Sequence, residues 1–321
     1  MNAASIICAL LIALTFVNNI LCYPHQHTAA LAQPGCGRPV HAPNLSPDIS
    51  LRVDNPSVKV NAHSWPWQVS ITYANLSQPG RGSCGGTIID KEWVLTAAHC
   101  IALQNLTTKQ WYMLPDGSDF CVWDGLHNVT DRETPCPRTG KAIKHKEHKA
   151  FTGPADIDIA LLHVTPPFDY NHKVMPVCLA DSEIEVGTRC YTTGWGMDRV
   201  FRIDENGWLV LESEVPRELL SQATQFITKC ASGRGEKLCA RGPPVRKPDE
   251  PNARIESACS GDSGGPLVCQ ASDDRWVLHG VVSQGPGYCG SGGPHQPLWY
   301  TQYSSVFYQR AFIKSRGEDY Q

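Results

Sequence analysis

Of the two serines in the glycine-rich stretch "ACSGDSGGPLVC" at residues 258–269, the second, Ser263, directly follows an aspartate, and a cysteine stands near each end of the stretch. A serine hydroxyl is a weak nucleophile at neutral pH, so a catalytic serine needs a general base within reach and a third group that orients this base. The flanking glycines let backbone N–H groups approach a developing oxyanion without interference from side chains. Ser263 is therefore a candidate nucleophile for acyl transfer.

Two upstream motifs supply a base and an orienting acid. "VLTAAHC" places His99 at the end of one apolar run, and "DIDIALLHV" places Asp158 at the start of another. Asp156 is the alternative acid, but only Asp158 directly precedes "IALL". A structural histidine beside a disulfide is the alternative for His99, and the two partners argue against it. The order along the chain is His99, Asp158, Ser263.

The stretch "GDSGG" also fits the G-x-S-x-G elbow of α/β-hydrolases. In that fold the acid and the histidine follow the serine. The residues after Ser263 contain no such succession of strands, helices, acid and histidine, and the chain shows almost no β-α alternation. The hydrolase elbow is therefore rejected.

"TAAHC", "DIALL" and "GDSGGP", together with "SWPWQVS", "CGGTII" and "TTGWG", resemble the secreted chymotrypsin-like (trypsin-fold) serine proteases, closest to the chymotrypsin and pancreatic elastase type. The resemblance covers about residues 36–314. In this family, the established example of the triad, Ser263 would attack the peptide carbonyl, His99 would transfer the proton and Asp158 would orient the imidazole. The N–H groups of Gly261 and Ser263 would form the oxyanion hole.

The predicted elements agree with an all-β chain. Short β-prone runs such as "WQVSITY", "EWVLTAA" and "RWVLHGVVSQ" are separated by Gly, Pro, Asn and Asp. Apolar residues at three- and four-residue intervals predict helices only over 215–230 and 305–316. A polar, Pro-rich insertion at 240–257 is too hydrophilic for the core. The resemblance implies two antiparallel six-stranded β-barrels with the triad between them and a C-terminal α-helix.

The N-terminal residues predict export. An apolar run within residues 1–22 is typical of a signal peptide. An uncleaved anchor or a buried helix is the alternative, because no Lys or Arg precedes the run. Residues 23–52, rich in Pro, His and Ala, indicate a propeptide. We expect barrels at 53–170 and 171–303, a C-terminal helix and tail at 304–321, and a secreted, extracellular protein.

Charge gives no sign of a nucleic-acid partner, because the net charge is −3 and no long run of one sign occurs. The resemblance implies protein or peptide substrates, protein inhibitors of proteases, a monomer, and no metal or organic cofactor. Four sequons, Asn44, Asn75, Asn105 and Asn128, fit a glycosylated secreted chain.

Cysteine usage supports an oxidising compartment. Of 14 cysteines, Cys8 and Cys22 belong to the predicted signal peptide, and the rest form an even set. The resemblance implies the pairs Cys36–Cys178, Cys84–Cys100, Cys190–Cys269, Cys230–Cys239 and Cys259–Cys289. Cys121 and Cys136 remain and most simply pair with each other. The Cys36–Cys178 bond would tether the propeptide after cleavage.

The resemblance also implies activation by cleavage between Arg52 and Val53, which a trypsin-like protease would perform. The new N-terminal ammonium would pair with Asp262. The terminus "VDNP" departs from the usual two aliphatic residues and two glycines, since it carries a charge and a proline. Cleavage at Lys59, exposing "VNAHSWP", is the alternative but leaves a short arm.

The resemblance further implies that Ser257, six residues before Ser263, forms the floor of the specificity pocket. A serine there argues against substrates with Arg or Lys at P1, and Glu256 is a minor alternative because an extended chain points it to the other face. Leu298 would make the pocket shallow, which favours elastase-like cleavage after small or medium aliphatic residues, with chymotrypsin-like cleavage second. The other predicted substrate-binding residues are Ser260, Ser283, Gln284 and Gly285.

Two further alternatives concern function. The stretch "KAIKHKEHKAF" at 141–151 could be an anionic exosite or a metal site, but we interpret it as a solvated surface strand because such charge runs are usually solvated. The whole chain could also be a catalytically silent protease homologue that acts as a secreted binding module. The retained triad argues against this, and only "VDNP" supports it.

Overall fold

The computed structural model describes residues 35–45, 60–74, 83–105, 107–115, 117–203, 209–231, 236–245, 254–255, 257–285 and 300–318. All of them belong to one compact unit, Ala32–Gln321. No helix among these residues is long and apolar enough to span a membrane.

Six antiparallel strands close the first barrel in the order β1-β2-β3-β8-β7-β6. They are β1 (Gln68–Tyr73), β2 (Cys84–Asp90), β3 (Trp93–Thr96), β6 (Asp119–Trp123), β7 (Arg138–Ile143) and β8 (Ala160–Thr165). Most side chains of β1, β2, β3 and β8 are buried. Closure leaves no strand edge unpaired, so the catalytic candidates lie at the ends of rigid strands.

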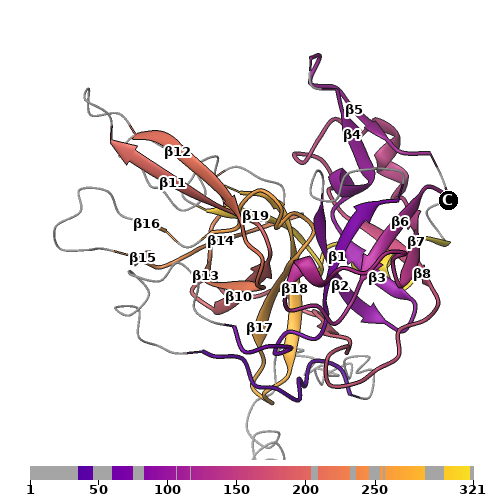
Figure 1. Ribbon diagram of the computed structural model, residues 1–321, viewed down its shortest axis with the longest axis horizontal. Coiled ribbons are helices and arrows are strands. Elements are labelled where there is room, and N and C mark those ends of the chain that lie inside the picture. Colours follow the sequence, from indigo (N-terminus) through magenta and orange to yellow (C-terminus); the bar gives the residue numbers. More distant parts are fainter. Residues whose placement is uncertain are drawn as a thin grey trace, which may run out of the picture. The chain divides into compact units, whose positions relative to one another are not determined.

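The second barrel is a ring of six strands in the order β17-β10-β13-β14-β19-β18, closed by pairing of β17 with β18. A short strand, β9 (Cys178–Leu179), adds to β18 in parallel. The ring strands are β10 (Arg189–Gly194), β13 (Ser221–Thr228), β14 (Lys237–Arg241), β17 (Pro266–Gln270), β18 (Trp276–Gln284) and β19 (Thr301–Ser305). The predicted pair of six-stranded barrels is confirmed, and Figure 1 shows both groups of strands.

Shorter elements surround the barrels. The hairpins are β4 (Ala102–Gln104) with β5 (Trp111–Met113), β11 (Met197–Ile203) with β12 (Leu209–Pro216), and β15 (Pro244–Val245) with β16 (Arg254–Ile255). The 3₁₀ helices are η2 (Ala98–Ile101), η3 (Val129–Asp131) and η4 (Lys146–Ala150). The C-terminal helix, α2 (Arg310–Lys314), confirms the expected element but is shorter than 305–316.

The predicted helix at 215–230 is wrong. Residues 215–216 end β12, and 221–228 form β13, which pairs with β10 and β14. Most side chains of β13 are buried, as is typical of a strand that pairs with a neighbour on each side. Apolar residues three and four apart also suit two strands joined by a turn, so the spacing alone was ambiguous.

Buried polar contacts join the two barrels. Gln68 on β1 accepts a hydrogen bond from the Thr193 hydroxyl of β10 at 2.6 Å through Oε1. The indole N–H of Trp65 donates to Gln222 Oε1 of β13 at 3.0 Å. Trp65 and Trp67 are 2% and 0% exposed, so they are core residues. These contacts fix one barrel against the other.

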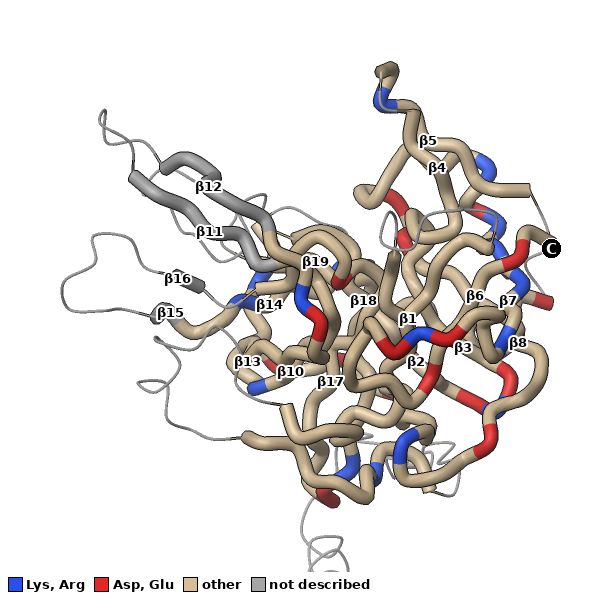
Figure 2. Tube along the Cα trace, viewed as in Figure 1, with Lys and Arg blue, Asp and Glu red and all other residues tan. Residues whose placement is uncertain are grey.

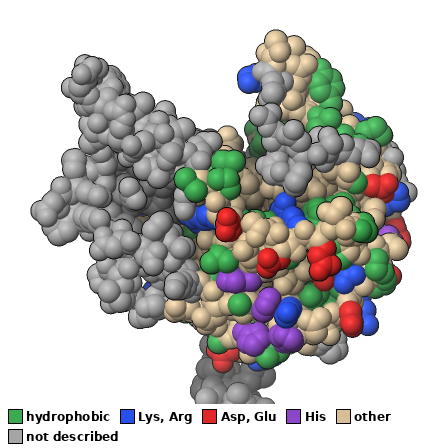
Figure 3. Space-filling model, in the orientation of Figure 1, with side chains coloured by type: hydrophobic (Ala, Val, Ile, Leu, Met, Phe, Trp, Pro, Cys, Tyr) green, Lys and Arg blue, Asp and Glu red, His purple; other side chains and the backbone are tan. Residues whose placement is uncertain are grey.

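The segment 35–45, part of the predicted propeptide, is held on the second barrel and its neighbouring loops. The predicted Cys36–Cys178 disulfide is formed. Gly37 N–H donates to the Pro176 carbonyl at 2.9 Å, and its own carbonyl accepts from Trp276 N–H at 2.8 Å. Figure 3 shows histidine side chains gathered on one face, and the His41 ring lies 5.5 Å from that of His172. This segment is therefore docked along its length.

Four further predicted disulfides are formed: Cys84–Cys100, Cys121–Cys136, Cys190–Cys269 and Cys230–Cys239. Cys190 and Cys269 face each other in the register of β10 and β17. Cys259 is also disulfide-bonded, but its predicted partner Cys289 lies outside the described residues. Figure 2 shows acidic and basic residues interspersed along the described chain.

Candidate active site

His99 lies in η2, directly after strand β3 of the first barrel. Its Nδ1 is 2.8 Å from Asp158 Oδ2, and its backbone N–H donates to Asp158 Oδ1 at 2.8 Å. The imidazole is 11% exposed and lies edge-on to Trp111 of β5, with ring centroids 6.1 Å apart. Because Nδ1 carries the proton toward a carboxylate, Nε2 is left as the acceptor, which is the tautomer a general base requires.

Asp158 is completely buried just before strand β8. Burial opposes its ionisation, but His99, Lys237 and the Ser283 hydroxyl outweigh burial and hold the pKa of Asp158 below its ordinary value. Ser283 Oγ donates to Asp158 Oδ2 at 2.5 Å. The alternative acid, Asp156, instead accepts hydrogen bonds from the backbone and hydroxyl of Thr152. The structure thus brings His99 together with Asp158 alone.

Ser263 lies in the turn before β17, partly buried, and its carbonyl accepts a hydrogen bond from Gly85 N–H of β2 at 2.7 Å. Gly264 has a φ of +77°, and a Cβ there would stand 2.2 Å from Thr96 Oγ1. The sequence needs glycine at this position because the turn packs directly on the first barrel. No hydrogen bond joins Ser263 to His99 among the described residues; such contacts often tighten only when substrate binds.

The expected oxyanion hole lies in the same turn. Gly261 has a φ of +97°, and neither its N–H nor that of Ser263 donates a backbone hydrogen bond within the described part of the chain. Between them, the buried Asp262 carboxylate accepts from Gly196 N–H and Cys259 N–H, each at 2.8 Å. These bonds hold Asp262 inward and orient the two free amides on either side of it.

The predicted pocket residues are only partly described. Ser257 Oγ is buried without a hydrogen-bond partner among the described residues, which suits the floor of a pocket. Ser283 is buried and contacts Asp158. Gln284 and Ser260 are exposed. A Cβ on Gly285 would lie 2.8 Å from the Ala258 carbonyl oxygen, so a larger residue would not fit at this position unless the backbone shifted. Leu298 lies outside the described residues, as do Arg52, Val53 and Asn75.

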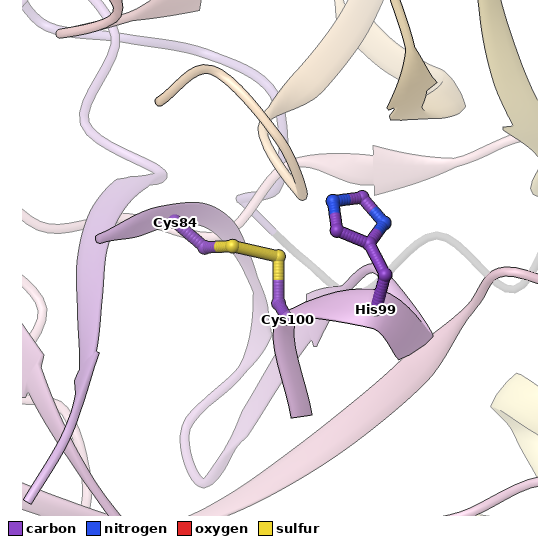
Figure 4. Close-up of side chains that lie close together, drawn as sticks. All are labelled: Cys84, His99 and Cys100. Carbon is purple, nitrogen blue, oxygen red and sulfur yellow. A yellow bond between two sulfur atoms is a disulfide. The ribbon is translucent and has the colours of Figure 1, made fainter. Parts of the chain in front are cut away.

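Two sulfur atoms lie beside His99, and Figure 4 shows them bonded to each other. Cys84, His99 and Cys100 place their ligand-type atoms within 4.8 Å of one another. The two sulfurs form the Cys84–Cys100 disulfide with an S–S distance of 2.00 Å, so neither is a thiolate. This group therefore braces the segment that carries His99 and does not make a metal site.

The interpretation of 141–151 as a surface strand is only partly right. Strand β7 ends at Ile143, and η4 follows. His145 and His148 are buried, and burial lowers the pKa of both, that of His148 to about 4. The lysines of the stretch are mostly exposed while the histidines pack inward, which a charge count does not reveal.

Sequence reasoning also missed two residues of the second barrel that contact the loop carrying Asp158. Ser304 Oγ of β19 donates to the Asp158 carbonyl at 2.6 Å. Lys237 of β14 donates through Nζ to Ser283 Oγ at 3.1 Å and to the Pro154 carbonyl at 2.7 Å. A lone Ser or Lys in a strand gives no local signal, because only the barrel packing brings these groups to Asp158.

The described sequons differ in exposure. Asn105 is exposed, whereas Asn44 and Asn128 are partly buried, and Asn128 Oδ1 accepts hydrogen bonds from both the N–H and the hydroxyl of Thr130. Asn105 is thus the most accessible of the three for a glycosyltransferase.

Comparison with known families agrees with this geometry. A family model described as Trypsin matches residues 56–309, which is most of the chain and contains both barrels and the three candidate residues. Members of this family act on protein substrates and are blocked by protein inhibitors. Disulfides are typical of its secreted members. The chain belongs to the trypsin family and has the fold of the chymotrypsin-type serine proteases.

Proposed function

We propose that this chain is an active, secreted serine endopeptidase. Ser263 attacks the peptide carbonyl, His99 takes its proton at Nε2 and later returns it to the leaving amine, and Asp158 orients the imidazole. The N–H groups of Gly261 and Ser263 stabilise the oxyanion. The observation that carries this proposal is the Nδ1 contact of His99 with a completely buried, ionised Asp158, in a trypsin-family fold that presents Ser263 on a glycine-bounded turn.

The finer features of the proposal rest on the sequence. A signal peptide directs export, cleavage after Arg52 by a trypsin-like protease frees Val53, and the new ammonium reaches the inward-facing Asp262. The active chain is a monomer, glycosylated at its sequons. Ser257 and Leu298 favour an elastase-like preference for small or medium aliphatic residues at P1, with aromatic residues second.

A labelling experiment tests the activity. The purified zymogen is treated with trypsin, its new N-terminus is sequenced, and the product is titrated with a fluorophosphonate beside a Ser263→Ala control. We expect labelling only after cleavage at Arg52 and none in the control. A scan of P1 residues on short peptides then tests the preference for aliphatic side chains.

A catalytically silent homologue is the second candidate, favoured by the irregular "VDNP" terminus. It predicts correct cleavage at Arg52 without labelling of Ser263. That outcome would mean that the protein acts by binding a partner, and that its cleft is a docking surface rather than a catalytic one.

A further inference from the structure

Lys237 extends its amine toward the catalytic centre from strand β14 of the second barrel. Its Nζ donates to the Pro154 carbonyl at 2.7 Å and to Ser283 Oγ at 3.1 Å. Ser283 Oγ donates in turn to Asp158 Oδ2 at 2.5 Å. The amine therefore stands one hydroxyl away from the carboxylate that contacts His99.

The hydroxyl proton of Ser283 has two acceptors within reach, Asp158 Oδ2 and the Pro154 carbonyl, which lies 3.2 Å from Oγ. An ammonium group has three donors and no acceptor, so the Ser283 oxygen must accept from Lys237 and keeps its own proton to donate. Lys237 Nζ also donates to the Pro154 carbonyl oxygen, which therefore competes less for the Ser283 proton. The hydroxyl proton is therefore directed to Asp158.

The charges around Lys237 favour its protonated form. Burial lowers the pKa of Lys237, while Asp158, Asp156 and Glu236 act in the opposite direction. Asp158 Oδ2 accepts the hydroxyl of Ser283, through which Lys237 reaches it, and the same oxygen is in contact with His99 Nδ1. His148 interacts with Asp158 at longer range, and burial keeps His148 neutral. Lys237 is thus a cation that balances the charge of Asp158 through Ser283, in addition to the contact of Asp158 with His99.

We propose that Lys237 is a positioning residue of the catalytic centre: its ammonium fixes the Ser283 hydroxyl on Asp158 and offsets part of the carboxylate charge that His99 experiences. The catalytic consequence rests on the protease function proposed above. The geometry itself concerns groups that are present whether or not the chain is active, so it is measurable in an inactive variant.

The three successive contacts place Lys237 Nζ within about 8 Å of His99 Nδ1. Removing a positive charge at that distance favours the imidazolium of His99, by about one pH unit for an effective dielectric constant between roughly 20 and 40. Lys237→Met removes the charge and the donor, whereas Lys237→Gln removes the charge but keeps a donor. Lys229→Met, at an exposed position after β13, changes the net charge equally and serves as the control.

The first measurement is the ¹⁵N chemical-shift titration of the His99 imidazole, made in the Ser263→Ala background of the full chain. We expect its midpoint to rise by about one pH unit in both Lys237 variants and to stay unchanged in Lys229→Met. Midpoints that match the control in a folded Lys237 variant would overturn the proposal. If Lys237→Met does not fold, Lys237→Gln decides alone, since it retains a polar group of similar length.

The second measurement uses the active chain. Lys237→Met should lower kcat about tenfold with little change in KM, and Lys237→Gln should recover most of the loss, because only the former releases the Ser283 hydroxyl. A packing defect would lower thermal stability without moving the acid limb of the pH profile, which would contradict the proposal. If wild-type Ser263 is never labelled, the protease function fails, while the His99 titration still tests Lys237.

Discussion

Protonation of His148 should weaken the segment that carries Asp158. His148 Nδ1 accepts the His145 N–H at 3.1 Å, so the ring proton sits on Nε2 and is donated to the Ile157 carbonyl, also at 3.1 Å. A second proton on Nδ1 would face the His145 N–H. Burial, with a contribution from His145, accordingly lowers the pKa of His148 to about 4. The substitution that tests this is His148→Gln, which removes the titration.

The difference in the pKa of His148 between the folded and unfolded chain sets how the free energy of unfolding depends on pH. The unfolded chain takes up the proton near pH 6.5 and the folded chain only near 4, so the unfolded state binds more protons between these values. The stability that neutral His148 provides is complete above pH 6.5 and is lost as the pH falls toward 4. The slope is about 1.2 kcal/mol per pH unit near pH 5.5, or about 2 kcal/mol between pH 7.5 and 5. His279, whose burial also lowers its pKa to about 4, adds a similar loss.

Urea unfolding of the Ser263→Ala chain at several pH values measures this loss without autolysis. We expect the dependence of the unfolding free energy on pH between 5 and 7 to fall by about 1 kcal/mol per pH unit in His148→Gln. The control is His163→Gln, whose side chain is 42% exposed. An unchanged slope in His148→Gln, with the same slope in the control, would refute the assignment of a buried neutral histidine beside Ile157.

Two glycine substitutions test the turn that carries Ser263. Gly264→Ala places a Cβ 2.2 Å from Thr96 Oγ1 at a φ of +77°, so we expect a loss of about 2–4 kcal/mol in unfolding free energy by urea titration; a loss below about 1 kcal/mol would contradict the tight packing of this turn. Gly196→Ala places a Cβ within 2.4–2.6 Å of the Asp262 carboxylate oxygens. We expect labelling of Ser263 to slow about tenfold, and a normal labelling rate would show that Asp262 need not stay inward.

Much of the site was predictable because its signals are local. The "GDSGGP", "TAAHC" and "DIALL" motifs each sit where a strand begins or ends, and the barrels bring these ends together. The disulfide pairs followed from the family resemblance. Strand predictions succeeded for the same reason, since short β-prone runs between turn residues have few alternative structures.

The failures concern features without a local signal. The apolar spacing at 215–230 fits a helix or two strands equally, and only pairing with β10 and β14 selects strands. Burial of His145 and His148 depends on the packing of η4, to which Phe312 of α2 contributes with its ring centroid 5.0 Å from that of His145. The partly buried Lys237 also leaves no pattern, because its partners are separated from it by tens of residues.

The contacts of Asp158 show that the geometry of the candidate site depends on the packing of the two barrels. Asp158 precedes a strand of the first barrel, yet Ser283 and Ser304 of the second barrel donate to its carboxylate and to its carbonyl. Lys237, also of the second barrel, holds the Pro154 carbonyl of the same loop. A relative shift of the barrels would therefore displace the acid from His99 at the same time as it moved Ser263. Substitutions at the buried contact between Gln68 and Thr193, remote from the reacting atoms, should accordingly lower kcat as well as the free energy of unfolding.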